Sequence, residues 1–390
     1  MIMTGNKNIH FLSAADRINY GDLLFPLIFK KIAEENGYTF NNYGIVRSNL
    51  SLFGALPTKS YKILLRTIKS ESGKLIIGGG EVFFADWRTL YGFINPFYSK
   101  ALKYKRIAAL EKKIRFSKFY LCFNQVAIPF CPSKNELLND KVKIYYNSVG
   151  GSLPYGKNKK EIENIKQALN NASLVSVRDK RTADELKKLN VNSKIVPDSA
   201  IIISSIFSKE EILENKTLDN KNLKNYIFLQ LGINKGPNNL VQFALQIKKL
   251  SNELNLNVIL CPIGKAPGHE DNIILKKLQL IESDFHYIEP KNIFDIMYLI
   301  SNSSIYMGTS LHGLITAQSF NVPFVGLNEK LEKVNAYTTT WIGENYRSLS
   351  FEEIDKTLNI FYSWNFSRIA KKNQEQIKLV KENIFTILDD

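Results

Sequence analysis

The residues best suited to chemistry follow short apolar runs, where strands of a parallel sheet would end. His312 comes shortly after the apolar run 305–307, and Thr309 or Ser310 can cap a helix that reaches about Phe320. In the first turn of such a helix the dipole disfavours the charged imidazolium, and a neutral ring or backbone amides can face an anion. His312 is therefore a candidate acid or base, the alternative being a structural or surface histidine.

Arg178 occupies the same kind of position, directly after the apolar run 173–177 and before a helix that begins near Thr182. A guanidinium at the end of a strand can hold a phosphate or a carboxylate through two parallel hydrogen bonds. The alternative is an ion pair with Asp179 or another neighbouring carboxylate. Asp179 itself is better suited to cap the helix than to act as a catalytic acid.

Further candidates lie in turns between predicted elements, and they are Asn19, Gly21, Asp22, Gly79, Gly80, Lys235, Lys265 and His269. The first three precede an apolar helix, so ordinary turn and capping chemistry explains them well. The glycines let a backbone approach a ligand closely, although their segment is neither a GxGxxG motif nor a P-loop. The two lysines and His269 could bring positive charge to a cleft, but most lysines are simply solvated.

These residues belong to a chain of 390 residues, 44% of them hydrophobic, which is enough for two domains of ordinary size. The net charge of +15 favours anionic partners such as phosphorylated metabolites, acidic glycans, a membrane surface or nucleic acid. Three cysteines without a CxxC pair and four histidines support neither a disulfide framework nor a structural zinc cluster, and they indicate a reducing compartment.

No apolar run approaches the roughly 20 residues that cross a bilayer. Residues 1–13 lack the apolar stretch of a secretory signal. We therefore expect a cytoplasmic protein.

Short apolar runs followed by turns and helical patterns predict an α/β protein with two Rossmann-like, doubly wound domains that face each other across a cleft. The predicted strands are 9–11, 75–77, 143–146, 174–177 and 194–196 in the first domain, and 227–231, 258–260, 285–288, 305–307 and 324–326 in the second. The expected organisation is an N-terminal domain at 1–207, a polar linker at 208–224, a C-terminal domain at 225–345 and closing helices at 346–390.

Residues 97–120 carry eight lysines and arginines against the single acid Glu111, with apolar and aromatic residues between them. We interpret this stretch as a basic amphipathic helix, which suits an anionic membrane surface or a lipid-linked substrate. A solvated helix with one face toward the core explains the pattern equally well. No recognisable module supports nucleic-acid binding.

Several motifs together, in their order and spacing, resemble the polysaccharide pyruvyl transferase family. They are NYGD at 19–22, LIIGGG at 75–80, SVRDKRTADELKKL at 176–189, VPDSA at 196–200 and SLHGLITA at 310–317. The resemblance implies two Rossmann-like halves in a GT-B-like arrangement. It also implies transfer of pyruvate from phosphoenolpyruvate to a sugar, closure as a ketal on two hydroxyls and release of phosphate, with no cofactor or metal. The N-terminal domain would take the acceptor and the C-terminal domain the donor.

By the same resemblance, Arg178 and His312 match family positions that bind phosphoenolpyruvate or take part in transfer, with Ser310 and Leu311 beside them. Well-studied members carry arginine immediately before the Leu-His pair, where this chain has Ser310. One anion-binding guanidinium is therefore missing. Either Lys235 or Lys265 compensates for it, or the donor is different.

The acceptor implied by the resemblance is a sugar of a cell-surface polysaccharide, such as a capsule or exopolysaccharide, or of its lipid-linked precursor. A nucleotide-sugar glycosyltransferase of GT-B shape is the main alternative. Its two characteristic glutamates would fall at Gly308 and Thr316, and both are absent. A second alternative is a non-catalytic relative that binds carbohydrate or membrane.

Overall fold

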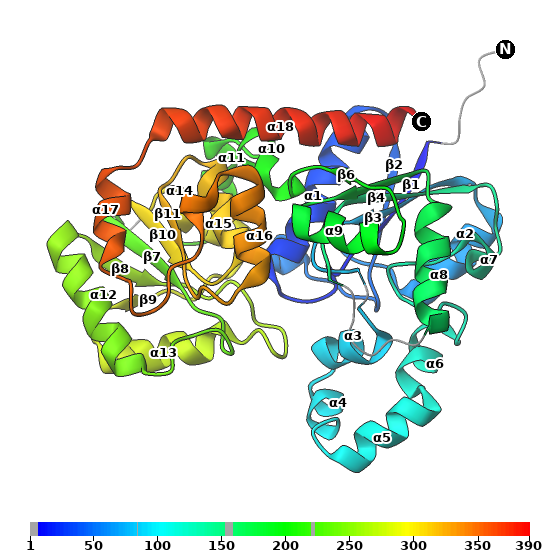
Figure 1. Ribbon diagram of the computed structural model, residues 1–390, viewed down its shortest axis with the longest axis horizontal. Coiled ribbons are helices and arrows are strands. Elements are labelled where there is room, and N and C mark those ends of the chain that lie inside the picture. The colour runs from blue at the N-terminus through cyan, green and yellow to red at the C-terminus, as the bar shows by residue number, and fades with distance from the viewer. Residues whose placement is uncertain (1–6, 84, 153–158, 220–222) are drawn as a thin grey trace.

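The computed structural model describes residues 7–83, 85–152, 159–219 and 223–390, and Figure 1 shows two α/β domains side by side. The first sheet has the order β2-β1-β3-β4-β5-β6, and the second has the order β11-β10-β7-β8-β9. Every pairing in both sheets is parallel. The predicted α/β class with two parallel sheets is confirmed.

The strands of the first sheet are β1 (Asn8–Leu12), β2 (Thr39–Tyr43), β3 (Gly73–Gly78), β4 (Val142–Val149), β5 (Leu174–Val177) and β6 (Lys194–Ile195). Those of the second sheet are β7 (Tyr226–Gln230), β8 (Asn257–Leu260), β9 (His286–Tyr287), β10 (Ile305–Gly308) and β11 (Phe324–Gly326). The sequence missed only β2, which lies at the edge of its sheet and contains Asn41 and Asn42. An edge strand tolerates such polar residues, so the apolar pattern is weak there.

The helices of the first domain are α1 (Tyr20–Glu35), α2 (Tyr61–Ser70), α3 (Trp87–Ile94), α4 (Pro96–Ala101), α5 (Lys105–Ile114), α6 (Phe116–Cys122), α7 (Lys134–Leu137), α8 (Lys159–Asn170) and α9 (Lys180–Lys188). In chain order, the last strand of the first sheet is followed by η2 (Ser199–Ile202), α10 (Ile203–Ile206) and α11 (Lys209–Asn215), before the second sheet begins. The remaining helices are α12 (Leu240–Leu254), α13 (Asp271–Ile281), α14 (Ile293–Ser301), α15 (Leu311–Ser319), α16 (Glu332–Trp341), α17 (Lys356–Tyr362) and α18 (Phe366–Asp389), and short turns form η1 (Ser51–Phe53) and η3 (Glu344–Tyr346).

The segment 208–224, expected to be a polar linker, contains the helix α11. The hydroxyl of Ser208 caps this helix by accepting a hydrogen bond from the Glu211 amide at 3.1 Å, and Ile212 is buried. The side chain of Lys31 in α1 forms an ion pair with Glu211 at 2.9 Å. The sequence does not reveal this helix, because seven residues with one buried side chain leave no apolar period to detect. Residues 220–222 of this segment lie outside the described residues.

The basic stretch 97–120 is not one helix. It is divided among α4, α5 and α6, and Arg115 adopts a left-handed backbone with φ 57° between the last two. A left-handed residue ends a helix and turns the chain. The stretch therefore folds back on itself as a group of short helices, which Figure 1 shows projecting away from both sheets.

The last helix, α18, runs along both domains (Figure 1). In its first half Asn373 exchanges hydrogen bonds with Gln318 of α15. In its second half the fully buried Asn383 donates to Asn147 of β4 at 2.9 Å and to Ser176 of β5 at 3.1 Å. The helix thus ties the two sheets together. Within the described residues, no helix combines the length and the apolar character that a membrane span requires.

Candidate active site

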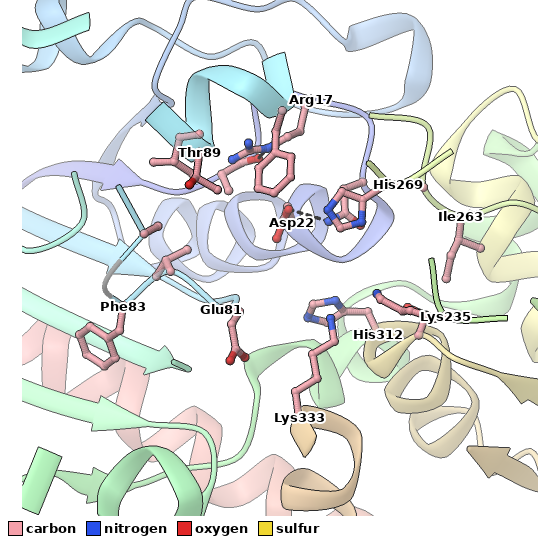
Figure 2. A pocket seen from close by; sticks show the side chains of 18 of the residues that line it. Arg17, Asp22, Glu81, Phe83, Thr89, Lys235, Ile263, His269, His312 and Lys333 are labelled. Carbon is pink, nitrogen blue, oxygen red and sulfur yellow. Dashed lines mark hydrogen bonds between the residues drawn. The ribbon is translucent and has the colours of Figure 1, made fainter. Parts of the chain in front are cut away.

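A cavity of about 490 Å³ lies between the two domains, and Figure 2 shows the side chains that line it. The first domain contributes Arg17, Asn19, Asp22, Glu81 and Arg178, and the second contributes Gln230, Lys235, His269, Asp271, Ser310, His312 and Lys333. Most of these residues follow the carboxyl ends of strands, which is where ligands of doubly wound sheets bind. The volume suits a small metabolite and part of a sugar.

His312 lies in the first turn of α15, as predicted, and Ser310 is the N-cap whose hydroxyl accepts from the Gly313 amide at 3.5 Å. The side chain of His312 is 10% exposed, and its Nε2 lies 3.6 Å from Oδ2 of Asp198, which is fully buried. Burial alone would raise the pKa of Asp198, but the contact and charge of His312 and the charge of Arg178 lower it overall. Asp198 therefore stays ionised and orients the ring.

The guanidinium of Arg178 is surrounded by carboxylates. Its Nη2 bonds Glu81, its Nη1 lies 3.4 Å from Oδ2 of Asp198, and its Nε lies 3.5 Å from Asp179. Arg178 is 1% exposed, so the ion-pair interpretation of this residue is the one that the geometry favours. Because Arg178 and His312 share one oxygen of Asp198, these separations leave their nitrogens at most about 7 Å apart.

The motif at 19–22 meets the motif at 310–317 in the cavity wall. Gly21 faces the imidazole so closely that a Cβ there would lie 1.8 Å from Nδ1 of His312. Asn19 donates a hydrogen bond to Asp22 at 2.8 Å. Burial raises the pKa of Asp22. The glycine is thus required for the ring of His312 to reach its position, a contact that no local sequence signal reveals.

Two lysines face the cavity from the second domain. Lys235 follows β7 in a turn held by Thr309, whose Oγ1 accepts from the Gly232 amide at 2.9 Å. Lys333 lies in the first turn of α16, which Trp341 anchors to the first domain by donating to the carbonyl of Arg178 at 2.7 Å.

Burial and the neighbouring charge of Lys235 lower the pKa of Lys333 to about 7, and burial lowers that of Lys235. Among the described residues, no carboxylate lies within ion-pair distance of either ammonium. Their attractions to Glu81, Asp22 and Asp271 act only over longer distances. Two half-buried cations without a direct counter-ion form a site that an anion would stabilise.

Two further titratable groups lie beside the lysines. Asp271 accepts hydrogen bonds at Oδ2 from Gln230 at 2.8 Å and from the Gly264 amide at 3.0 Å, and burial raises its pKa to about 6. His269 packs against Phe93 of α3 at 5.4 Å between ring centres. Burial and the charges of the two lysines and Arg17 lower the pKa of His269 to about 4, so its ring is neutral near pH 7.

The structure brings most of the sequence candidates together. Those that line the cavity are Asn19, Asp22, Arg178, Lys235, His269, Ser310 and His312. Lys265 does not, because it bonds Glu289 and the carbonyl of Pro290, so the expectation that it brings charge to the cleft is wrong. His269 supplies no charge either. Leu311 is fully buried in the core.

The glycines after β3 serve packing. Gly79 and Gly80 both have positive φ, of 60° and 75°, and a Cβ at Gly79 would lie 2.3 Å from the ring of Phe25. Neither lines the cavity. The sequence led us to expect that these two glycines bind a ligand. Instead they form a turn that packs against α1 and leads to Glu81.

Sequence reasoning missed Arg17, Asp198, Asp271 and Lys333. Asp198 had a usable signal, because it stands in the VPDSA motif just after β6 and caps η2 through the Ala200 amide at 3.1 Å. Lys333 had none, because it is one of 52 lysines and arginines and lies on a helix rather than at the end of a strand. Within the part of the chain that the structure describes, there is no group of three or more side chains suited to bind a metal ion.

A model of the family described as polysaccharide pyruvyl transferase matches residues 123–330, more than half of the chain. The chain belongs to the polysaccharide pyruvyl transferase family. It is therefore a transferase of polysaccharide biosynthesis, and the matched part includes Arg178, Asp198, Lys235 and His312. No curated protein sequence matches the chain.

Solved structures show the same arrangement of two domains. A UDP-GlcNAc 2-epimerase from Neisseria meningitidis bound to UDP-GlcNAc has a TM-score of 0.53 and 14% identity, over 97% of this chain and 99% of that one. The epimerase from Methanocaldococcus jannaschii has 0.54 and 12%, over 96% and 99%. A glycosyltransferase from Rickettsia africae has 0.51 and 10%, over 99% and 96%. At such identities the likeness concerns the fold, and it confirms the predicted GT-B-like arrangement.

Proposed function

We propose that the protein transfers pyruvate from phosphoenolpyruvate to a sugar and closes it as a ketal on two hydroxyls. The observation that carries this proposal is the pair Lys235 and Lys333, two cations without a direct counter-ion, in the same cavity as the pair His312 and Asp198. An anionic donor suits the first pair, and proton transfer suits the second. The pyruvyl transferase family supplies the reaction class.

In this proposal the lysines hold the phosphate of the donor. Lys333 thus takes the place of the arginine that precedes the Leu-His pair in other members of the family, where this chain has Ser310. Arg17, which also lines the cavity, is the candidate partner of the donor carboxylate. Arg178 acts through Asp198 and Glu81, so it is a positioning residue rather than a ligand of the donor.

The reaction needs one proton acceptor and one proton donor. His312 accepts the proton of the first sugar hydroxyl as its oxygen bonds C2 of the enolpyruvyl group, and Asp271, with its pKa raised to about 6, donates a proton to the methylene carbon. The second hydroxyl then displaces phosphate from the same carbon. The proton lost by the first hydroxyl is matched by the proton that turns the methylene into a methyl group. The proton of the second hydroxyl leaves with the phosphate. No cofactor is required.

The acceptor in this proposal is a sugar of a cell-surface polysaccharide, such as a capsule or exopolysaccharide, or its lipid-linked precursor. The protein would then work in the cytoplasm, at the inner face of the membrane where such precursors are built. The N-terminal domain, with Asn19 and Asp22 in the cavity wall, would take the acceptor, and the C-terminal domain would take the donor.

A nucleotide-sugar glycosyltransferase is the second candidate, since a pair of lysines also suits a diphosphate and one structural neighbour is described as bound to UDP-GlcNAc. Isothermal titration with phosphoenolpyruvate and with nucleotide sugars separates the two. We expect phosphoenolpyruvate to bind, and Lys235→Met/Lys333→Met to abolish that binding. Binding of nucleotide sugars alone would favour the second candidate, and binding of neither would favour a non-catalytic relative. Incubation with phosphoenolpyruvate and a panel of sugars, followed by phosphate release, then tests the transfer itself.

A further inference from the structure

The helices α3 to α6 form a module that stands out from the first domain (Figure 1). Its inner helix α3 contributes Thr89, Leu90 and Phe93 to the lining of the cavity. The helices α4 and α5 lie at the far end, away from both sheets. One module therefore reaches from the candidate active site to an outer surface of the molecule.

Exposed apolar side chains are concentrated in this module. Of the twenty-two large apolar side chains that are exposed among the described residues, nine fall within the 27 positions from 97 to 123. They are Phe97, Tyr104, Ile107, Leu110, Ile114, Phe116, Phe119, Tyr120 and Phe123. Ile107, Leu110 and Ile114 share one face of α5 and are 43%, 55% and 59% exposed. Single exposed apolar residues are ordinary, but a cluster of this kind marks a surface that contacts something apolar.

The same helices present only positive charge to the outside. Seven of the eight basic residues between 97 and 120 are exposed, and Lys118 is half-buried. The single acid, Glu111, is 7% exposed and accepts hydrogen bonds at Oε1 from the Ser117 amide at 2.9 Å and from its hydroxyl at 2.6 Å. The acid thus closes the turn between α5 and α6 and does not balance the surface lysines.

We propose that this surface, residues 97–123, docks the protein on an anionic lipid membrane. Interleaved lysines and apolar side chains match the headgroups and the acyl boundary of such a membrane at the same time. A second copy of the chain is a poorer occupant, because two surfaces of like charge on molecules of net charge +15 repel each other. Nucleic acid would match the lysines but would leave the isoleucines and leucine of α5 in water.

Docking through this module explains why its inner end lines the cavity. Phe93 of α3 packs on Arg17 at 5.5 Å and on His269 of the second domain at 5.4 Å, so the module meets both domains at the site. A membrane held against α4 and α5 lies on the same side of the molecule as this wall. If the acceptor is lipid-linked, a step that rests on the proposed function, its sugar can enter the cavity while its lipid stays in the bilayer.

Sedimentation of the full chain with lipid vesicles tests the docking. We expect binding to vesicles of phosphatidylcholine mixed with phosphatidylglycerol, weaker as salt rises, and little binding to phosphatidylcholine alone. The variant Lys105→Gln/Arg106→Gln/Lys112→Gln/Lys113→Gln should lower the partition coefficient at least about tenfold. The variant Ile107→Ser/Leu110→Ser/Ile114→Ser should lower it by a similar factor at high salt, where the charges are screened.

Matched controls remove the same chemistry from other exposed positions. The charge control is Lys69→Gln/Lys249→Gln/Lys277→Gln/Lys371→Gln, and the apolar control is Leu245→Ser/Leu280→Ser. Both should bind vesicles as the parent protein does. Equal losses in the controls, equal binding to neutral vesicles, or no binding by the parent would each overturn the proposal. So would a dimer that the apolar variant of α5 converts to a monomer, because the surface would then be an interface between copies.

Failure of the docking proposal can be distinguished from failure of the proposed reaction, because the two are measured separately. Transfer to a soluble sugar acceptor should be unchanged in the variants of α5, because their residues lie outside the cavity. Vesicle binding should likewise be unchanged in Lys333→Met. Loss of transfer to a soluble acceptor in the charge variant of α5 would contradict a docking role for this surface, whatever the donor proves to be.

Discussion

The cavity contains two kinds of positively charged side chain. One is paired with carboxylates and the other is not, and we expect the first to matter for the fold and the second for binding. Each of the three guanidinium nitrogens of Arg178 lies near a carboxylate, and these belong to Glu81, Asp179 and Asp198. Around Lys235 and Lys333 there is no carboxylate at ion-pair distance among the described residues, and burial lowers the pKa of both. A compensated charge orients its partners and is costly to remove alone, whereas an uncompensated pair weakens the fold until an anion arrives.

The largest effect is expected at His312, where the compensated group meets the cavity. His312→Ala should lower kcat about 10² to 10⁴-fold, the usual range for general acid–base catalysis, and should change donor affinity much less. The measurement is phosphate release under saturating donor, together with calorimetric donor affinity. Asp198→Asn, which keeps the shape and removes the charge, should lower kcat in the same direction. A fully active His312→Ala protein would contradict the assignment of the base.

Removing the compensating cation should damage stability. Arg178→Met leaves Asp179 and Asp198 buried without their partner, which typically costs about 3–5 kcal/mol in the free energy of unfolding. Urea unfolding measures this loss. Arg347→Met is the control, since Arg347 pairs with Glu344 at the surface and should matter little. An Arg178→Met protein of unchanged stability that no longer binds donor would show instead that the guanidinium holds the donor.

Removing an uncompensated cation should weaken donor binding and leave the stability of the fold intact. Lys333→Met should raise the dissociation constant of phosphoenolpyruvate about 10 to 100-fold, as expected for a lost charge-assisted hydrogen bond, and should leave the melting temperature equal or higher. Calorimetry and thermal unfolding test the two parts. Lys265→Met is the matched control, because Lys265 bonds Glu289 outside the cavity and its loss should leave donor affinity unchanged. A lower melting temperature with unchanged affinity would make Lys333 a structural residue.

The smallest effect is the pH dependence of donor binding. With the pKa of Lys333 at about 7 in the free protein, the side chain loses its proton as pH rises above 7, and an anion that needs the ammonium must then bind together with a proton. Donor affinity should therefore fall by up to about tenfold per pH unit above 7. Lys333→Arg, whose charge does not titrate in this range, should flatten the dependence. An equal slope in both proteins would assign the titration to another group.

How far the sequence could go depends on where each residue stands. Arg178 and His312 follow strands, and the apolar runs that reveal those strands also place the residues at one edge of each sheet. Lys333 is brought to the cavity by the packing of α16 on the first domain, which no local pattern encodes. Lys265 was misplaced because Glu289, distant in sequence, takes its charge. The pairing of Gly21 with His312 likewise joins segments that only the closed fold brings together.

The helix α18 joins the two domains a second time and so restricts how they can move apart. The chain passes from the first domain to the second through η2 and α10, and α18 packs on η2 where it crosses back, so the two crossings lie beside each other. Two bodies joined along a line keep one easy degree of freedom, a rotation about that axis, and each atom then moves in proportion to its distance from it. Asp198 caps η2 at this junction, so a rotation of the domains about it would change the spacing of Asp198 and His312 little. The contact between Asp198 and His312 is thus set by the joined domains themselves, and such a rotation would move groups farther from the junction more.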